Sequence, residues 1–171
     1  MDKNRLSKTL TAALNAQMTK EAQASQTYLS YASWASSQGY GGIANFLFKH
    51  SKEERNHMMK LLEYILKRCG DVKICAIPAP PENPSNIHSC FEKVFEHEVD
   101  NTNSIYKLVN MSFTEEDWST WNFLQWFVNE QMEEETFAIS LIDKLKMAGG
   151  VHASTDALYS FDRDLNTTCA S

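Results

Sequence analysis

The sequence predicts an all-α fold, a bundle of four long helices with one long crossover loop and a short fifth helix at the C-terminal end. Proline and glycine are nearly absent from long stretches, and apolar residues recur at helical spacing within them. Few segments show the alternation of apolar and polar residues that is typical of strands. The predicted helices cover residues 4–37, 43–69, 86–112, 115–147 and 155–166.

Short breaks separate the helices within each of two pairs. The glycine-rich stretch 39–42 separates the first helix from the second, and residues 111–117 separate the third from the fourth. In the second of these breaks Thr114 is predicted to cap the fourth helix, with Asp117 three residues further on. Because these connections are short, the helices of each pair are expected to be antiparallel neighbours.

The connection between the second and third helices is long and contains all four prolines. Its residues, 70–85, can span about 50–55 Å when extended. The second helix, at 1.5 Å per residue, should be about 40 Å long. The loop can therefore run the whole length of the bundle, which permits the second and third helices to be parallel.

The composition indicates a globular protein of one domain, residues 1–171. The formal net charge of −6 argues against nucleic acid as a partner, because such partners usually require a basic face. No apolar run approaches the roughly 18 residues of a membrane span, and the N-terminus lacks a signal peptide's apolar stretch. We therefore expect no membrane partner and a cytoplasmic location. The cysteines match no zinc or redox motif and are expected to be free thiols: Cys69, Cys75, Cys90 and Cys169.

Apolar residues trace one core-facing row on each long helix, and polar residues interrupt every row near its middle. On the second helix, Glu54 and His57 are three residues apart and therefore share a face. The interrupting residues, in chain order, are Glu21, Glu54, His57, Glu98, Gln131 and Glu134. In a bundle these levels can coincide, which would bring four carboxylates and one imidazole together.

Such a cluster requires positive charge, because burying even one unpaired carboxylate is costly and four would also repel one another. No lysine or arginine interrupts the four rows near the middle, so a pair of divalent metal ions is predicted to supply the charge. Di-iron bundles use one Glu from each of two helices and Glu-x-x-His from the other two. This chain has one such motif. Its oxygen and nitrogen ligands suit iron or manganese, and zinc can also bind such a set.

Each of these features alone has a plainer explanation. A single Glu-x-x-His motif is common by chance, and the acidic run 130–135 is typical of a solvated helix face. Glu98 beside His97 could form a surface ion pair, and Tyr28 could be a core tyrosine with a satisfied hydroxyl. The coincidence across four helices is what favours a metal site.

Several motifs follow one another in a specific order and spacing. They are LNAQMTKEAQASQTYLS, KHSKEERNHM, EHE at 96–98, NFLQWFVNEQMEEE and IDKLKMAGG. In these motifs, over nearly its whole length, the chain resembles the non-haem ferritins and is most similar to the bacterial type. The resemblance implies a ferritin-like four-helix bundle that acts as a ferroxidase and iron store. It also implies a hollow homo-oligomeric cage of 24 subunits, in which Fe(II) is oxidised by dioxygen or peroxide and Fe(III) mineral accumulates.

The resemblance also implies which residues hold iron. The first iron would be held by Glu21, Glu54 and His57. Glu54 would bridge to a second iron, held also by Glu98 with Gln131 or Glu134 beside it. A third, weaker site would use Glu53, Glu130, Glu133 and Glu134. Tyr28 and Trp126 match residues that can supply an electron during oxygen reduction.

The chain also departs from related families. Bacterioferritins carry a haem-ligating methionine just after the second-helix glutamate, where this chain has Arg55, and a second Glu-x-x-His that Phe137 interrupts here. No haem is therefore expected. Animal ferritins line their threefold pores with acids, where this chain has Trp121 and Leu124, so the same iron entry route is not expected.

Two other functions remain open at this point. A structural or binding bundle with vestigial acids is one, although the complete ligand set argues against it. A di-iron oxidase or peroxidase with another substrate is the second, and would require a substrate pocket and often a second histidine. The resemblance implies a cage here as well, because ferritins use the short fifth helix at the fourfold axis.

Overall fold

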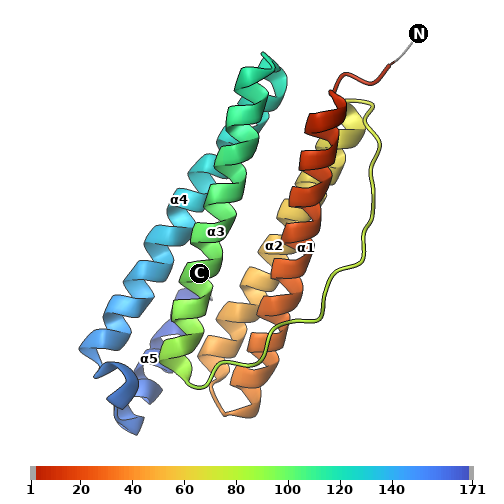
Figure 1. Ribbon diagram of the computed structural model, residues 1–171. Coiled ribbons are helices and arrows are strands. Elements are labelled where there is room, and N and C mark those ends of the chain that lie inside the picture. The colour runs from red at the N-terminus through yellow and green to blue at the C-terminus, as the bar shows by residue number, and fades with distance from the viewer. Residues whose placement is uncertain (1–2, 170–171) are drawn as a thin grey trace.

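The computed structural model describes residues 3–169, and these form an all-helical bundle (Figure 1). The elements are α1 (Lys8–Ser37), α2 (Gly41–Lys67), α3 (Ile87–Thr114), α4 (Trp118–Met147), a 3₁₀ turn (Gly150–His152) and α5 (Thr155–Cys169). No strand occurs among these residues, and none of their helices is long and apolar enough to cross a membrane. The predicted four-helix bundle with a fifth helix is confirmed.

Several predicted helix ends were wrong by a few residues, and at some of them a side-chain cap sets the end. The first helix starts at residue 8 rather than 4, since the hydroxyl of Ser7 accepts a hydrogen bond from Leu10 N at 3.0 Å. The second covers 41–67 rather than 43–69, and the third covers 87–114 rather than 86–112. The fifth extends to residue 169 rather than 166.

Thr114 does not cap α4, and this prediction was wrong. Its hydroxyl donates to Asn110 O at 2.8 Å and so belongs to the last turn of α3. The cap is Asp117, whose carboxylate accepts hydrogen bonds from Thr120 N at 3.0 Å and from the Thr120 hydroxyl at 2.8 Å. Glu116, with a φ of 57°, makes the turn between the two helices. The negative charge of a carboxylate cap also interacts favourably with the positive end of the helix dipole.

The loop of residues 70–85 runs along the side of the bundle, so α2 and α3 point the same way, as predicted (Figure 1). Asn15 of α1 holds its beginning: Nδ2 donates to Asp71 O at 2.9 Å, and Oδ1 accepts from Lys73 N at 2.6 Å. The closest packing is within two antiparallel hairpins, α1 with α2 and α3 with α4.

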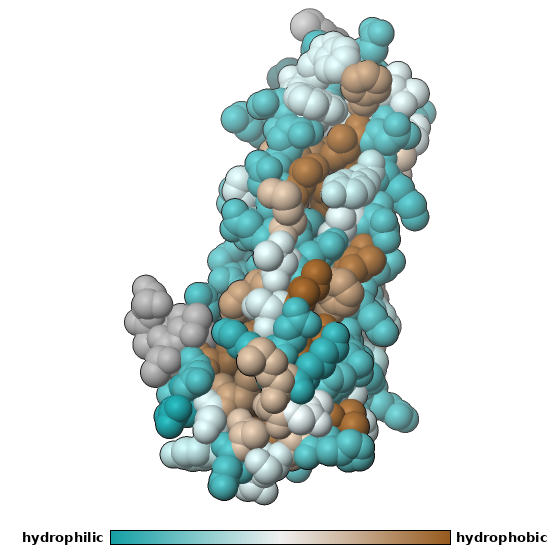
Figure 2. Space-filling model, turned by 90° about the vertical axis from the view of Figure 1, so that its left-hand side faces the viewer, coloured by the Kyte–Doolittle hydropathy of each residue, from teal (hydrophilic) through white to brown (hydrophobic). Residues whose placement is uncertain are grey.

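The apolar core consists of two clusters at different levels of the bundle. One, near α5, includes Phe46, Phe91 and Leu141. The other, towards the opposite end, includes Leu14 and Phe127. Apolar side chains also reach the surface in separate patches among hydrophilic ones, as one face shows in Figure 2. The level between the clusters is polar, and it is there that the interrupted rows meet.

Helix α5 is fixed to the start of α2. Tyr40, the residue before α2, makes no side-chain cap, and the carboxylate of Asp162 on α5 serves instead by accepting from Ile43 N at 2.8 Å. The close approach requires glycine at position 42, because a Cβ there would lie 1.8 Å from Asp162 O. This contact ties α5 to the start of α2.

Candidate metal centre

A layer of buried polar side chains crosses the bundle between the two apolar clusters. All of its members are at most 4% exposed, and they come from all four long helices. They are Gln17, Glu21, Glu54, His57, Glu98, Asn101 and Gln131. The four interruptions predicted from the sequence therefore do reach the interior together.

Glu21, Glu54 and His57 form the tightest group in this layer, with one donor atom from each lying within 4.8 Å of the others. His57 Nδ1 is 3.5 Å from Glu54 Oε2, and both atoms are buried without a hydrogen-bond partner. Buried polar atoms are nearly always satisfied in folded proteins, so two such atoms facing one another are placed to share a ligand. A cation that accepts both lone pairs fits this arrangement.

The electrostatics of the layer also favour a cation. Burial raises the pKa of Glu54 well above its usual range, and the neighbouring Glu21 carboxylate raises it further. Burial raises the pKa of Glu98 as well, although His97, Tyr28 and Gln131 partly oppose this effect. The layer must therefore hold protons when no cation is present, and a divalent ion would displace them.

Glu98 is held by side chains of α1 and α4. The Tyr28 hydroxyl donates to Glu98 Oε1, and Gln131 Nε2 donates to Glu98 Oε2 at 3.2 Å. Gln131 also donates to the Glu98 backbone oxygen at 3.2 Å. The structure thus brings Gln131 to Glu98, and the charge of Glu98 acts on Glu54 in the neighbouring group.

Asn101 joins the two halves of the layer, and the sequence reasoning missed it. Its Nδ2 lies 3.4 Å from both carboxylate oxygens of Glu21 and 3.3 Å from Gln131 Oε1. Gln17 Nε2 donates to Glu21 Oε1 at 2.7 Å and to Asn101 Oδ1 at 2.6 Å. The available signal was the missing apolar residue one helical turn after Glu98, where Asn101 stands in the core-facing row.

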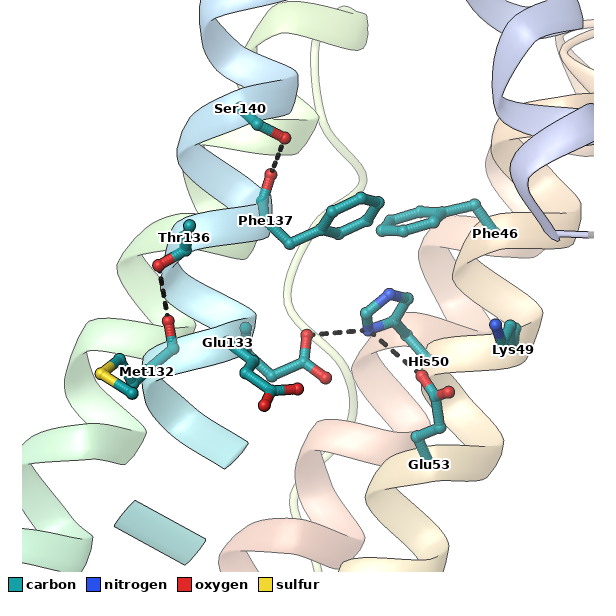
Figure 3. Close-up of a pocket in the computed structure, with 10 residues that line it drawn as sticks. Phe46, Lys49, His50, Glu53, Met132, Glu133, Thr136, Phe137 and Ser140 are labelled. Atoms are coloured by element: carbon teal, nitrogen blue, oxygen red, sulfur yellow. Dashed lines mark hydrogen bonds and ion pairs between the residues drawn. The ribbon is translucent and has the colours of Figure 1, made fainter. Parts of the chain in front are cut away.

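A second group lies beside this layer, in the groove between α2 and α4 (Figure 3). His50 Nδ1 is 3.6 Å from Glu53 Oε2 and 3.5 Å from Glu134 Oε2, and these three residues also satisfy the spacing of a metal site. They line a cavity of about 650 Å³, His50 and Glu53 from α2 and Glu134 from α4. Glu134 thus belongs with Glu53 in this outer group, and the charge of Glu98 also acts on it.

The remaining acids of the outer group lie at its edges. Glu130 Oε1 is 3.7 Å from His57 Nε2, which places this carboxylate between the inner and outer groups. Glu133 is exposed and lines the same cavity. The sequence analysis did not recognise His50 as a ligand. Its position three residues before Glu53 was the available signal.

The charge states of the outer group follow from burial. Burial, with the charges of Glu98 and Glu53, raises the pKa of Glu134 to about 8. Burial lowers the pKa of His50 to about 4, although two carboxylates near Nδ1 would favour the charged imidazole. The positive charge of Lys49 and the neighbouring His57 lower the pKa of His50 further. His50 is therefore uncharged at neutral pH and able to offer a lone pair.

The two residues expected to donate electrons lie at different depths. Tyr28 is 1% exposed, and burial raises its pKa well above the usual range. Trp126 is 38% exposed and contacts the His57 ring edge-on, with ring centroids 5.4 Å apart. Of the two pore positions considered from the sequence, Leu124 is fully buried in this chain's own core and Trp121 is partly exposed.

An all-helical bundle with one long crossover and a buried layer of carboxylates, imidazole and amides defines the class of carboxylate metal-binding bundles. A family model described as "Ferritin-like domain" matches residues 11–148. The chain belongs to the ferritin family. Membership supports iron storage and ferroxidase chemistry in general, with iron as substrate and cargo.

Relatives of known name agree with this membership. The chain is 40% identical over 144 residues to the bacterial non-heme ferritin of Campylobacter jejuni, covering 84% of this chain and 86% of that one. It is 36% identical over 154 residues to the bacterial non-heme ferritin of Escherichia coli, covering 90% and 92%. Among solved structures, an open pore ferritin from Archaeoglobus fulgidus superimposes with a TM-score of 0.91 at 37% identity, covering 95% and 98%. The bacterial non-haem type expected from the motifs is confirmed.

Proposed function

We propose that this protein is a ferroxidase and iron store, which oxidises Fe(II) with dioxygen or peroxide and holds the Fe(III) product as mineral inside a cage of 24 copies. The observation that carries the proposal is the pair of orphaned, buried atoms Glu54 Oε2 and His57 Nδ1, 3.5 Å apart in a layer without a buried lysine or arginine. Family membership supplies iron as the cation in question.

We assign Glu21, Glu54 and His57 to the first iron, and Glu98 to the second, with Glu54 between them. Gln131 would orient Glu98 through its two hydrogen bonds. Oxygen-rich ligands stabilise Fe(III) more than Fe(II), so they favour loss of an electron from the bound substrate. Two Fe(II) ions held together can supply two electrons to one oxidant. The Tyr28 hydroxyl, hydrogen-bonded to Glu98, is placed to supply a further electron and proton.

We assign the outer group to a third, weaker iron site, and we add His50 to the residues expected there. The set is then His50, Glu53, Glu130, Glu133 and Glu134. Partial exposure of the acids would let iron leave more easily than from the buried layer. The cavity of about 650 Å³ beside this group offers a route between α2 and α4.

We further propose that residues 1–171 act as one domain and that the protein works in the cytoplasm. The proposed reaction involves no haem. A di-iron oxidase with an organic substrate is less favoured, because the cavity is lined by the outer group and not by Glu21, Glu54 or His57.

The test combines aerobic Fe(II) oxidation with particle size. Iron-free protein is mixed with two Fe(II) per subunit, oxidation is followed by absorbance, and size is measured by light scattering. Glu54→Ala and His57→Ala should each slow the initial phase by at least about tenfold. His50→Ala should leave the first turnover intact and slow later ones. An unchanged initial rate in both inner variants would refute the site, and a particle of subunit size would refute the cage.

A further inference from the structure

The ammonium group of Lys60 lies over the indole ring of Trp126, with Nζ 3.9 Å from the ring centroid. Lys60 belongs to α2 and Trp126 to α4, so the contact joins two helices that are not a hairpin pair. The other ring neighbour from α2 is His57, whose ring meets the indole at 77°. Trp126 therefore contacts a candidate iron ligand and a fixed positive charge together.

The charge of Lys60 is directed at the ring rather than at an acid. Within residues 3–169, no carboxylate lies within 4.0 Å of Lys60 Nζ, although Glu63 is one helical turn further along α2. Lys20 and Lys146, in contrast, pair with aspartates at 2.7 Å and 3.6 Å. The positive charge beside Trp126 is thus not neutralised by a direct ion pair.

A cation over an aromatic face is attracted by the negative charge of the neutral π-system. Removing one electron from the ring turns that attraction into repulsion between like charges. We propose that Lys60 is a positioning residue that raises the oxidation potential of Trp126, so that this indole resists weak oxidants. The proposal rests on the proposed ferroxidase function for its purpose, but its physical effect exists without iron.

The effect of Lys60 on Trp126 matters when dioxygen is reduced at a subunit that holds only one Fe(II). When one Fe(II) is bound, reducing one dioxygen to hydrogen peroxide requires a second electron. Fe(II) supplies one electron and Trp126 the other, which gives Fe(III) and a tryptophan radical cation, the species that the charge of Lys60 disfavours. The radical cation then loses its Nε1 proton and becomes the neutral tryptophanyl radical. The peroxide takes one proton from the indole Nε1 and one from solvent, which the 38% exposure of Trp126 makes accessible. Lys60 would restrict this route and so protect the indole.

The first experiment uses full-length, iron-free protein and a neutral oxidant, the trichloromethylperoxyl radical produced by pulse radiolysis. A neutral oxidant is chosen because its approach does not depend on the charge that is removed. Peptide mapping by mass spectrometry measures oxidation at Trp126 separately from the other tryptophans. The variants are Lys60→Met, Lys60→Gln and Lys60→Arg, with Lys67→Met as a matched loss of one exposed charge on the same helix.

Lys60→Met and Lys60→Gln should increase oxidation at Trp126 by about three- to tenfold, while Lys60→Arg and Lys67→Met stay near wild type. Equal oxidation in all five proteins would overturn the proposal, as would an equal increase in Lys67→Met. Circular dichroism checks that each variant is folded. If the contact of Lys60 with Trp126 were merely structural, its loss would not change oxidation at this ring. A rise in the Met and Gln variants alone supports the role.

The second experiment adds one Fe(II) per subunit in air and detects the tryptophanyl radical by freeze-quench electron paramagnetic resonance. Lys60→Met should give a signal several-fold larger than wild type, and Lys60→Met combined with Trp126→Phe should remove the increase. No increase in Lys60→Met, when iron is oxidised, would contradict the proposed role. If wild type fails to oxidise Fe(II), the ferroxidase proposal fails, and the iron-free experiment still decides the role of Lys60.

Discussion

Replacing Glu134 by glutamine should stabilise the iron-free protein, and the gain should depend on pH. Glu134 is 14% exposed as a side chain, and Glu98 and Glu53 are among the charges that disfavour its ionisation. Its pKa is raised from 4.5 to about 8. At neutral pH the folded protein must therefore keep this carboxyl protonated, or ionise it at a cost. Glutamine retains the shape and never carries the charge.

The size of the gain follows from the raised pKa of Glu134. The folded value exceeds the ordinary one by about 3.5, and each pKa unit corresponds to about 1.36 kcal/mol. The full difference would be near 5 kcal/mol, and screening by water at the partly exposed group reduces it to about 2–4 kcal/mol. Such a change is large against the total stability of a domain of this size.

The sign of the pH dependence is fixed by linkage. A raised folded pKa means that the folded chain binds the proton more tightly than the unfolded chain does. Below about pH 4.5 the carboxyl of Glu134 is protonated in both states, so Glu134→Gln should have little effect there. As pH rises from 4.5 to 8, wild type loses stability relative to the variant, and above pH 8 the difference is complete.

The assay is urea unfolding of wild type and Glu134→Gln between pH 5 and 8.5, in chelator and at equal protein concentration. Glu96→Gln, an exposed change on α3, is the matched control and should stay within about 0.5 kcal/mol. A gain that is the same at every pH would show better packing rather than relief of charge. No gain at pH 8.5 would refute the electrostatic reasoning about the outer group.

The remaining predictions concern caps, close approaches and metal. Gly42→Ala should cost at least about 2 kcal/mol in thermal or urea unfolding, because its Cβ would meet Asp162 O at 1.8 Å, whereas Gly41→Ala, with open space, should be neutral or slightly stabilising. Asp117→Ala should lower the free energy of unfolding by about 1–2 kcal/mol, since it removes the α4 cap and the 3.1 Å ion pair with Arg68; an unchanged midpoint would contradict the cap. A redox-inert divalent ion such as Zn²⁺ should raise the unfolding midpoint of wild type, and a chelator should reverse this; no shift at saturating ion would contradict the metal centre.

The fold was predictable because its signals are local and repeated. Long stretches without proline or glycine gave the helices, and the reach of residues 70–85 gave the parallel arrangement of α2 and α3. Helix ends were less predictable. The capping residue is whichever of several neighbouring side chains accepts the hydrogen bond from a backbone N–H at the helix start. Thr114 could cap a helix, but its hydroxyl bonds back into α3, and Asp117 caps α4.

The candidate site was predictable where a polar residue interrupts the apolar row of one helix. It was less predictable where the site depends on a contact between two helices. Glu21 and Glu54 interrupt apolar rows, which burial confirms. Asn101 was missed because it lies in a polar stretch, where a missing apolar residue in the core-facing row is less conspicuous. His50 was not recognised as a ligand because its significance depends on Glu134, 84 positions further along the chain, in the groove between α2 and α4.

The arrangement of the layer suggests why this fold tolerates so many buried carboxylates. The two hairpins, α1 with α2 and α3 with α4, pack closely within themselves and each carries part of both apolar clusters. The buried apolar side chains of these clusters stabilise the levels above and below the polar layer. Glu21, Glu54 and His57 come from the first hairpin, and Glu98 with Gln131 from the second. Ions held between these two sets would therefore join the hairpins at the level where their side chains repel one another most.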